Sequence, residues 1–233
     1  MDGDAPRRDA EGQNEVRSFV VPRDEVDFGD NWHVLGLRAT ASIDYSIDRV
    51  FVPRELTHPH YETVPTRGGG LYSLGVITLA CLVHSGFALG VGRHALDELA
   101  LLVRGAKAFL SQSESFLDRF GREELKLRAA RALCLDVWGD VQATIDRGES
   151  PTTRQHTLGR LALSYVTFTA AECCSFAYFS AGGVSLREST IQRCFRDMHA
   201  GAQHVLASFF GKEAGRELLG LAEGERWHGM MLS

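Results

Sequence analysis

The chain has 233 residues, of which 44% are hydrophobic and 24% are charged, so it has room for one large hydrophobic core or two small ones. Its formal net charge of -5 argues against a nucleic-acid partner or an anionic membrane surface, because either would require clustered positive charge. No stretch of about 18 apolar residues runs unbroken, as a membrane span would require.

Cysteine usage and the amino terminus indicate the cellular compartment. The five cysteines are odd in number, lie in apolar stretches and include no CxxC pair, which argues against a disulfide framework and a zinc site. The amino terminus is polar and acidic, and no apolar segment follows it as in a secretion signal. We therefore expect a cytoplasmic protein without a bound metal. The cysteines are Cys81, Cys134, Cys173, Cys174 and Cys194.

The amino-terminal quarter has the pattern of short strands. Residues 1–15 have little to bury and are predicted to be disordered. Between residues 16 and 66, three short β-rich segments are separated by polar residues, Gly or Asp, which predicts a partial antiparallel β domain. Three strands are too few to close a stable sheet alone. The segments are VRSFVV (16–21), WHVLGL (32–37) and DYSIDRVFV (44–52).

Proline and glycine then predict a linker. The RGGGLY run (67–72) follows a proline-rich stretch rather than a strand, so its glycines are interpreted as linker residues. His58 and His60 lie in the same stretch, which favours a solvated loop over a metal site. The punctuating residues are Pro53, Pro59, Pro65 and Gly68–Gly70.

Beyond Gly70 the apolar period becomes helical, which predicts a four-helix bundle over residues 67–222 and a tail at 223–233. Ser150 and Pro151 offer an N-cap and a first-turn proline for the third helix. The fold class is therefore mainly α, with a partial antiparallel β domain before a four-helix bundle. The predicted helices cover about residues 74–103, 123–147, 151–180 and 188–210.

The first predicted helix carries two further signals. Gly86 and Gly90 are four residues apart and fall on one helix face, which predicts a close backbone approach to a neighbouring helix. The segment from Leu74 to Val103 is apolar nearly all round, which indicates partners on more than one side. We therefore expect a homodimer or a homotetramer.

Chemistry-bearing motifs are scarce, and histidines on the last predicted helix are the main candidates. The sequence contains no phosphate loop, dinucleotide-binding glycine motif, serine-hydrolase elbow, zinc-protease motif or EF-hand loop. His199 and His204 are five residues apart, so on one helix they diverge by roughly 140° and cannot share a metal. The residues alone thus indicate an α-rich protein with a β appendage, with His204 either a structural histidine or part of a site.

Two regions resemble the acyl-CoA dehydrogenase superfamily, specifically its second type of C-terminal domain, which includes flavin-dependent monooxygenases of aromatic substrates. The first is NWHVLGLRATASIDYSIDRVFVPREL (31–56), where the β domain of that superfamily meets the flavin. The second comprises the bundle segments GRHALDELALLV (92–103), AGGVSLRESTIQRCFRDMHAGAQHVLAS (181–208) and AGRELLGL (214–221). The resemblance covers about residues 16–222, and the amino-terminal domain of the family has no counterpart in this sequence.

The resemblance implies a flavin site and its residues. His204 stands about where an acyl-CoA dehydrogenase carries its catalytic glutamate, which favours the monooxygenase branch. There His204 is the expected catalytic residue, and Trp32, Thr40 and Ser42 are the expected flavin contacts. Arg196 and Asp197 are expected to hold the helix in register.

The implied cofactor is reduced FAD or FMN from a partner flavin reductase, and the implied substrate is a small aromatic or acyl compound. Two alternatives stay open: an FAD-dependent acyl-CoA dehydrogenase, and a non-catalytic truncated subunit that serves oligomerisation.

Overall fold

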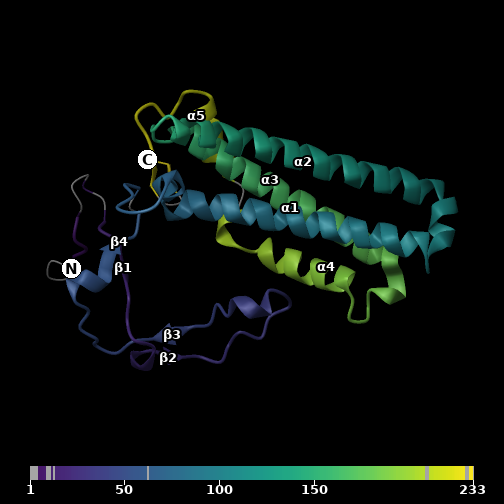
Figure 1. Cartoon of the computed structure of the whole chain (residues 1–233), viewed down its shortest axis with the longest axis horizontal. Coiled ribbons are helices and arrows are strands. Elements are labelled where there is room, and N and C mark those ends of the chain that lie inside the picture. The colour runs from purple at the N-terminus through teal and green to yellow at the C-terminus, as the bar shows by residue number, and fades with distance from the viewer. Residues whose placement is uncertain are drawn as a thin grey trace.

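Four helices form the body of the molecule, and a fifth follows them (Figure 1). In this computed structural model, residues 5–8, 12, 14–61, 63–207, 210–228 and 231–232 are described. The predicted mainly α fold with a helical bundle is confirmed. The helices are α1 (Gly75–Arg104), α2 (Glu114–Asp146), α3 (Thr153–Ala181), α4 (Thr190–Gly201) and α5 (Gly211–Leu218).

Helix capping sets the starts of α2 and α3. The Ser113 hydroxyl accepts the N–H of Phe116, so α2 begins nine residues before the predicted residue 123. Thr152 and Gln155 form a reciprocal capping box at the start of α3. The predicted cap at Ser150 with Pro151 in the first turn is therefore wrong, because Thr152 satisfies the free backbone N–H instead.

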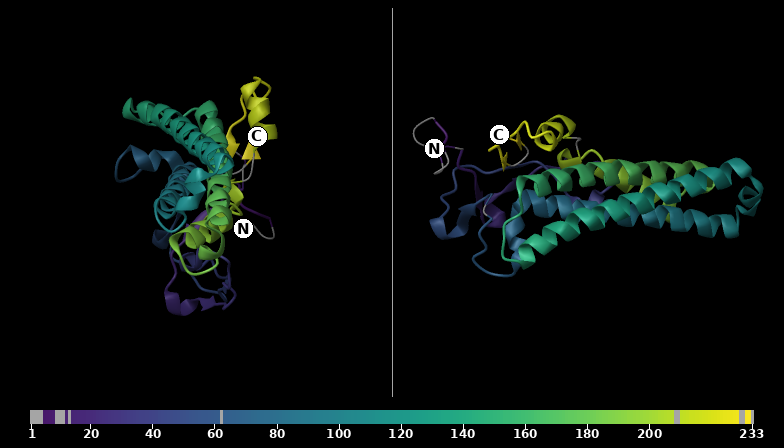
Figure 2. Two further views of the ribbon diagram at one scale, coloured as in Figure 1. Left: turned by 90° about the vertical axis from the view of Figure 1, so that its right-hand side faces the viewer. Right: turned by 90° about the horizontal axis from the view of Figure 1, so that it is seen from above.

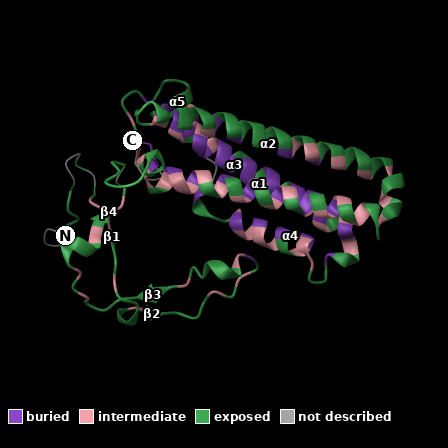
Figure 3. Ribbon diagram, viewed as in Figure 1, coloured by how far each residue is buried: buried purple, intermediate pink, exposed green. Residues whose placement is uncertain are grey.

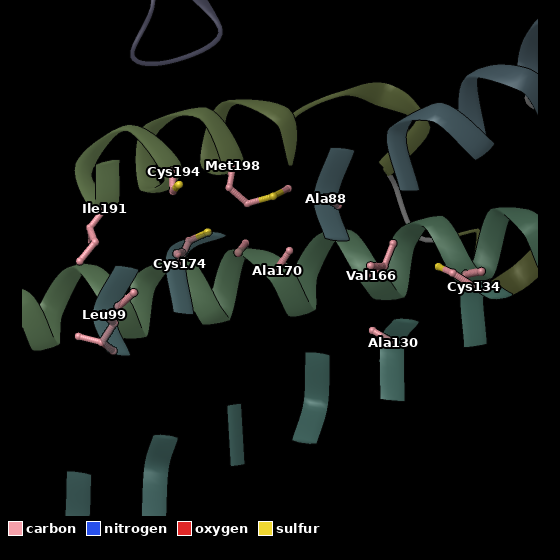
Figure 4. Packing of buried hydrophobic residues seen from close by; sticks show 14 of the residues in the cluster. Ala88, Leu99, Ala130, Cys134, Val166, Ala170, Cys174, Ile191, Cys194 and Met198 are labelled. Carbon is pink, nitrogen blue, oxygen red and sulfur yellow. The ribbon is translucent and has the colours of Figure 1, made fainter. Parts of the chain in front are cut away.

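The core lies along α3, which is buried over most of its length and packs against α1, α2 and α4 (Figures 3 and 4). Small side chains make this possible, since a Cβ at Gly92 would lie 3.1 Å from the Cβ of Ala170. Gly92 thus provides the close approach that was predicted for Gly86 and Gly90. That prediction is wrong within this chain, because no described atom lies within 4 Å of a Cβ placed at either position.

Helix α1 is strongly apolar. Together with the turn before it, Gly70–Arg104 is long and apolar enough to cross a membrane by length and composition. One such helix is weak evidence, because a core helix of a bundle passes the same test. In this structure α1 contacts α3, α4 and α2.

The segment before the bundle contains two small antiparallel sheets at one end of the molecule (Figure 2). β1 (Arg17–Phe19) pairs with β4 (Thr57–Pro59), and β2 (Asp27–Phe28) pairs with β3 (Tyr45–Ser46). β1 lies in the first predicted strand, and β3 is a short part of the third. The chain between β2 and β3 forms a long loop that reaches along the bundle towards α4 (Figure 1).

Two predictions for this segment are wrong. WHVLGL is not a strand, since residues 32–37 belong to the loop that packs on α4 and their hydrogen bonds go to that loop and that helix. Part of the predicted linker is ordered: β4 pairs with β1, and Gly70–Leu74 forms a short 3₁₀ helix. Gly70 packs against the side chain of Ile145, which leaves no room for a Cβ.

The carboxy-terminal part folds back on α3. β5 (Trp227–His228) and β6 (Met231–Leu232) form a hairpin, and the Trp227 indole N–H donates to Thr157 Oγ1 at 2.8 Å. The Arg160 guanidinium lies 4.2 Å from the centre of the Trp227 ring. Part of the predicted lead at residues 1–15 lies outside the described residues, and the division into domains stays a prediction.

Candidate functional site

The loop between β2 and β3 is fixed to α4 at Gly36 and Leu37. The Leu37 N–H donates to Asp197 Oδ1 at 2.8 Å, and Arg196 Nη1 donates to the Leu35 carbonyl at 3.4 Å. Gly36 is required at this contact, because a Cβ there would overlap the Arg196 carbonyl and lie 2.7 Å from the Asp197 nitrogen. The contact thus joins two parts of the chain about 160 residues apart.

Leu37 organises the turn that carries two of the expected flavin contacts. Its carbonyl accepts the Thr40 hydroxyl at 2.8 Å, the Thr40 N–H at 3.1 Å and the Trp32 indole N–H at 3.4 Å. Leu37 and Ala41 both have left-handed backbones, with φ of 53° and 46°. Such strain in non-glycine residues persists where surrounding contacts fix the chain. Ser42 lies exposed directly after this turn.

His204 lies in a turn after α4, not on a helix that continues to residue 210 as predicted. Helix α4 ends at Gly201, where Phe87 occupies the space: its Cε1 would lie 2.7 Å from a Cβ at that position. The 140° divergence predicted between the His199 and His204 side chains therefore does not apply, because that prediction assumed that both residues lie on one continuous helix. The Leu206 N–H donates to His204 Nδ1 at 3.2 Å and fixes the ring.

The turn brings His204 next to a histidine that the sequence analysis did not identify. The rings of His204 and His84 are 5.4 Å apart, and Phe87 meets the His84 ring edge-on at 5.5 Å. His84 Nε2 is buried and has no hydrogen-bond partner among the described residues. Burial lowers the pKa of His84, and the neighbouring charge of His204 lowers it further. His84 is therefore a neutral imidazole near neutral pH.

The histidine pair and the loop are linked through Gly201. A Cβ at Gly201 would contact Phe87 on one side and lie 3.7 Å from Leu37 Cδ1 on the other. Gly201, three residues before His204, thus lies beside both Phe87 and Leu37, whereas none of the described contacts joins His204 to Trp32 or Thr40.

His199 lies in different surroundings. Its Nε2 is 2.9 Å from the Ser175 hydroxyl, and its ring packs 4.3 Å from that of Phe195. Burial lowers the pKa of His199, which favours the neutral form. These contacts give His199 a packing role between α3 and α4.

Sequence reasoning missed two features of this site. Arg196 and Asp197 were expected to hold the helix in register, whereas they bind the loop at Leu35 and Leu37. His84 gave one signal only, as a histidine among apolar neighbours in a strongly apolar helix. That pattern is also typical of a satisfied core histidine, so only the structure shows its unpaired nitrogen.

Other candidate places lie away from these residues. A surface depression of about 350 Å³ lies between the start of α3 and the chain after α5, and none of the residues above lines it. Within the described ranges, no group of three or more His, Cys, Asp or Glu side chains could hold a metal ion.

The chain is thus a helical bundle whose helix α4 holds the loop between β2 and β3. The sequence profile described as "Acyl-CoA dehydrogenase, C-terminal domain" matches residues 82–209. The chain belongs to this family.

Curated relatives of the chain are named as hydroxylases and monooxygenases. A pigment production hydroxylase from a Rhodococcus species is 27% identical over 203 residues, covering 80% of this chain and 51% of the relative. An FADH(2)-dependent resorcinol hydroxylase, oxygenase component, from a Rhizobium species is 27% identical over 238 residues, covering 91% and 58%. The chain therefore spans about half the length of the relatives it matches.

Solved structures support the fold. XiaF from a Streptomyces species, in complex with FADH2 and glycerol, superposes with a TM-score of 0.79 at 20% identity, covering 96% of this chain and 59% of XiaF. Dibenzothiophene monooxygenase from a Paenibacillus species gives a TM-score of 0.72 at 21% identity, covering 92% and 58%.

Proposed function

We propose that this chain carries part of the active site of a reduced-flavin-dependent monooxygenase that hydroxylates an aromatic substrate. The observation that supports it best is the hydrogen bond from the Leu37 N–H of the loop to Asp197, on the helix that precedes His204, whose ring lies beside that of His84. The names of the curated relatives support the same class of oxidoreductase.

The residues present fit a flavin. Ser42 exposes a hydroxyl group that can donate to the ring or phosphate oxygens of a flavin, Thr40 exposes one that can accept from a flavin N–H, and Trp32 adds a half-buried aromatic surface beside them. The Thr40 hydroxyl donates to the Leu37 carbonyl, so it keeps its lone pairs free to accept a hydrogen bond. Of the similar solved structures, XiaF is in complex with FADH2 and the Paenibacillus enzyme is in complex with FMN, so reduced FAD is the first ligand to test and FMN the second.

When bound, a reduced flavin supplies the electrons that activate O2, so that one oxygen atom can be transferred to the substrate. The contribution of this chain is acid–base assistance and orientation. Because His204 Nδ1 accepts the Leu206 N–H, the neutral His204 ring carries its proton on Nε2. His204 therefore acts as a hydrogen-bond donor that can stabilise negative charge developing on oxygen.

The acyl-CoA dehydrogenase alternative needs a carboxylate as base. The carboxylate that the structure shows near this site, Asp197, is engaged by the Leu37 N–H on the loop. The oxygenase class also implies a flavin reductase as a partner protein. Self-association is a separate expectation, which the exposed apolar residues of α1 favour.

The proposal is tested with His204→Ala and with His199→Ala as the matched control. Hydroxylation is measured with reduced flavin from a reductase, and folding by thermal melting. We expect His204→Ala to lose roughly 10²-fold in rate with little loss of stability, as expected for lost acid–base assistance.

His199→Ala should keep its rate and lose about 1 kcal/mol of stability through the Ser175 contact. A wild-type protein that binds neither FAD nor FMN and hydroxylates nothing would support the non-catalytic subunit. A His204→Ala protein that melts lower with unchanged flavin chemistry would show that His204 is structural.

A further inference from the structure

We draw no further inference here: the strongest candidate, the surface depression between the start of α3 and the chain after α5 that Glu217, Glu223 and Glu225 line, rests on a cluster of carboxylates with no second observation that points to a ligand, since the Glu217 carboxylate is already paired with Arg154 and that of Glu225 with Arg216.

Discussion

Replacing Gly36 by alanine should detach the loop from α4 without unfolding the bundle. A Cβ at this position would overlap the Arg196 carbonyl and lie 2.7 Å from the Asp197 nitrogen, both of which are backbone atoms of a packed helix. Neither can shift cheaply, so the loop has to move instead. The hydrogen bond from the Leu37 N–H to Asp197 is then lost.

The magnitude follows from the contacts that are lost. A hydrogen bond to a charged group contributes about 1.5–3 kcal/mol to the free energy of unfolding. This is the expected loss of stability if the whole loop detaches from α4 while the bundle stays folded. The buried residues that form the main core cluster lie on the helices, so the bundle transition should persist. Flavin affinity should fall about tenfold or more, because a displaced loop removes at least one contact of about 1.4 kcal/mol.

Gly69→Ala is the matched control, since no described atom lies within 4 Å of a Cβ there and its φ is -99°. Urea unfolding followed by circular dichroism measures stability, and titration with FAD and FMN measures affinity. If Gly36→Ala matched Gly69→Ala in both assays, the docking of the loop on α4 would contribute neither to stability nor to a flavin site.

Three further predictions concern other parts of the molecule. His156 is buried beside Thr78, and its pKa is lowered to about 4, mainly because of burial. Between pH 6.5 and pH 4 the unfolded chain therefore binds a proton at His156 that the folded chain does not. Urea unfolding should then show stability falling by up to about 3 kcal/mol as the pH drops from 6.5 to 4, and His156→Gln should remove this slope. Ser42→Ala should weaken FAD or FMN binding in a titration, and an unchanged affinity would remove Ser42 from the site. Sedimentation of the wild type should show a dimer or tetramer that Val83→Asp, on the exposed face of α1, weakens; a wild-type monomer at micromolar concentration would contradict self-association.

The helices could be predicted because their signals are local. Apolar residues at helical spacing place α1 and α3 to within a few residues. This spacing is read from neighbouring residues alone, so it can be recognised without knowing which distant parts of the chain pack against the helix. The start of α2 was missed because the Ser113 hydroxyl, which accepts the Phe116 N–H, caps the helix well before the apolar stripe that we used to place it. Ends of helices are set by single side chains, which a periodic pattern averages out.

The loop could not be predicted because its partners are remote. WHVLGL has the composition of a strand, but Gly36 and Leu37 satisfy their packing and hydrogen bonding on α4, about 160 residues later. The resemblance to a flavin-binding family predicts this segment as one part of a site, and that stays a prediction. It could not show that Asp197 is the residue that holds it.

The histidine pair illustrates how apolar packing can place polar chemistry. Phe87 fills the position of a side chain at Gly201, where α4 ends and the chain turns. Beyond the turn, Leu206 packs with Cys81 and Leu163, and its backbone N–H fixes the His204 ring. The burial of Leu206 therefore places the backbone N–H that orients the His204 ring and sets its neutral tautomer. A substitution that repacks Leu206 or Phe87 should alter the chemistry of the site even though neither side chain can transfer a proton.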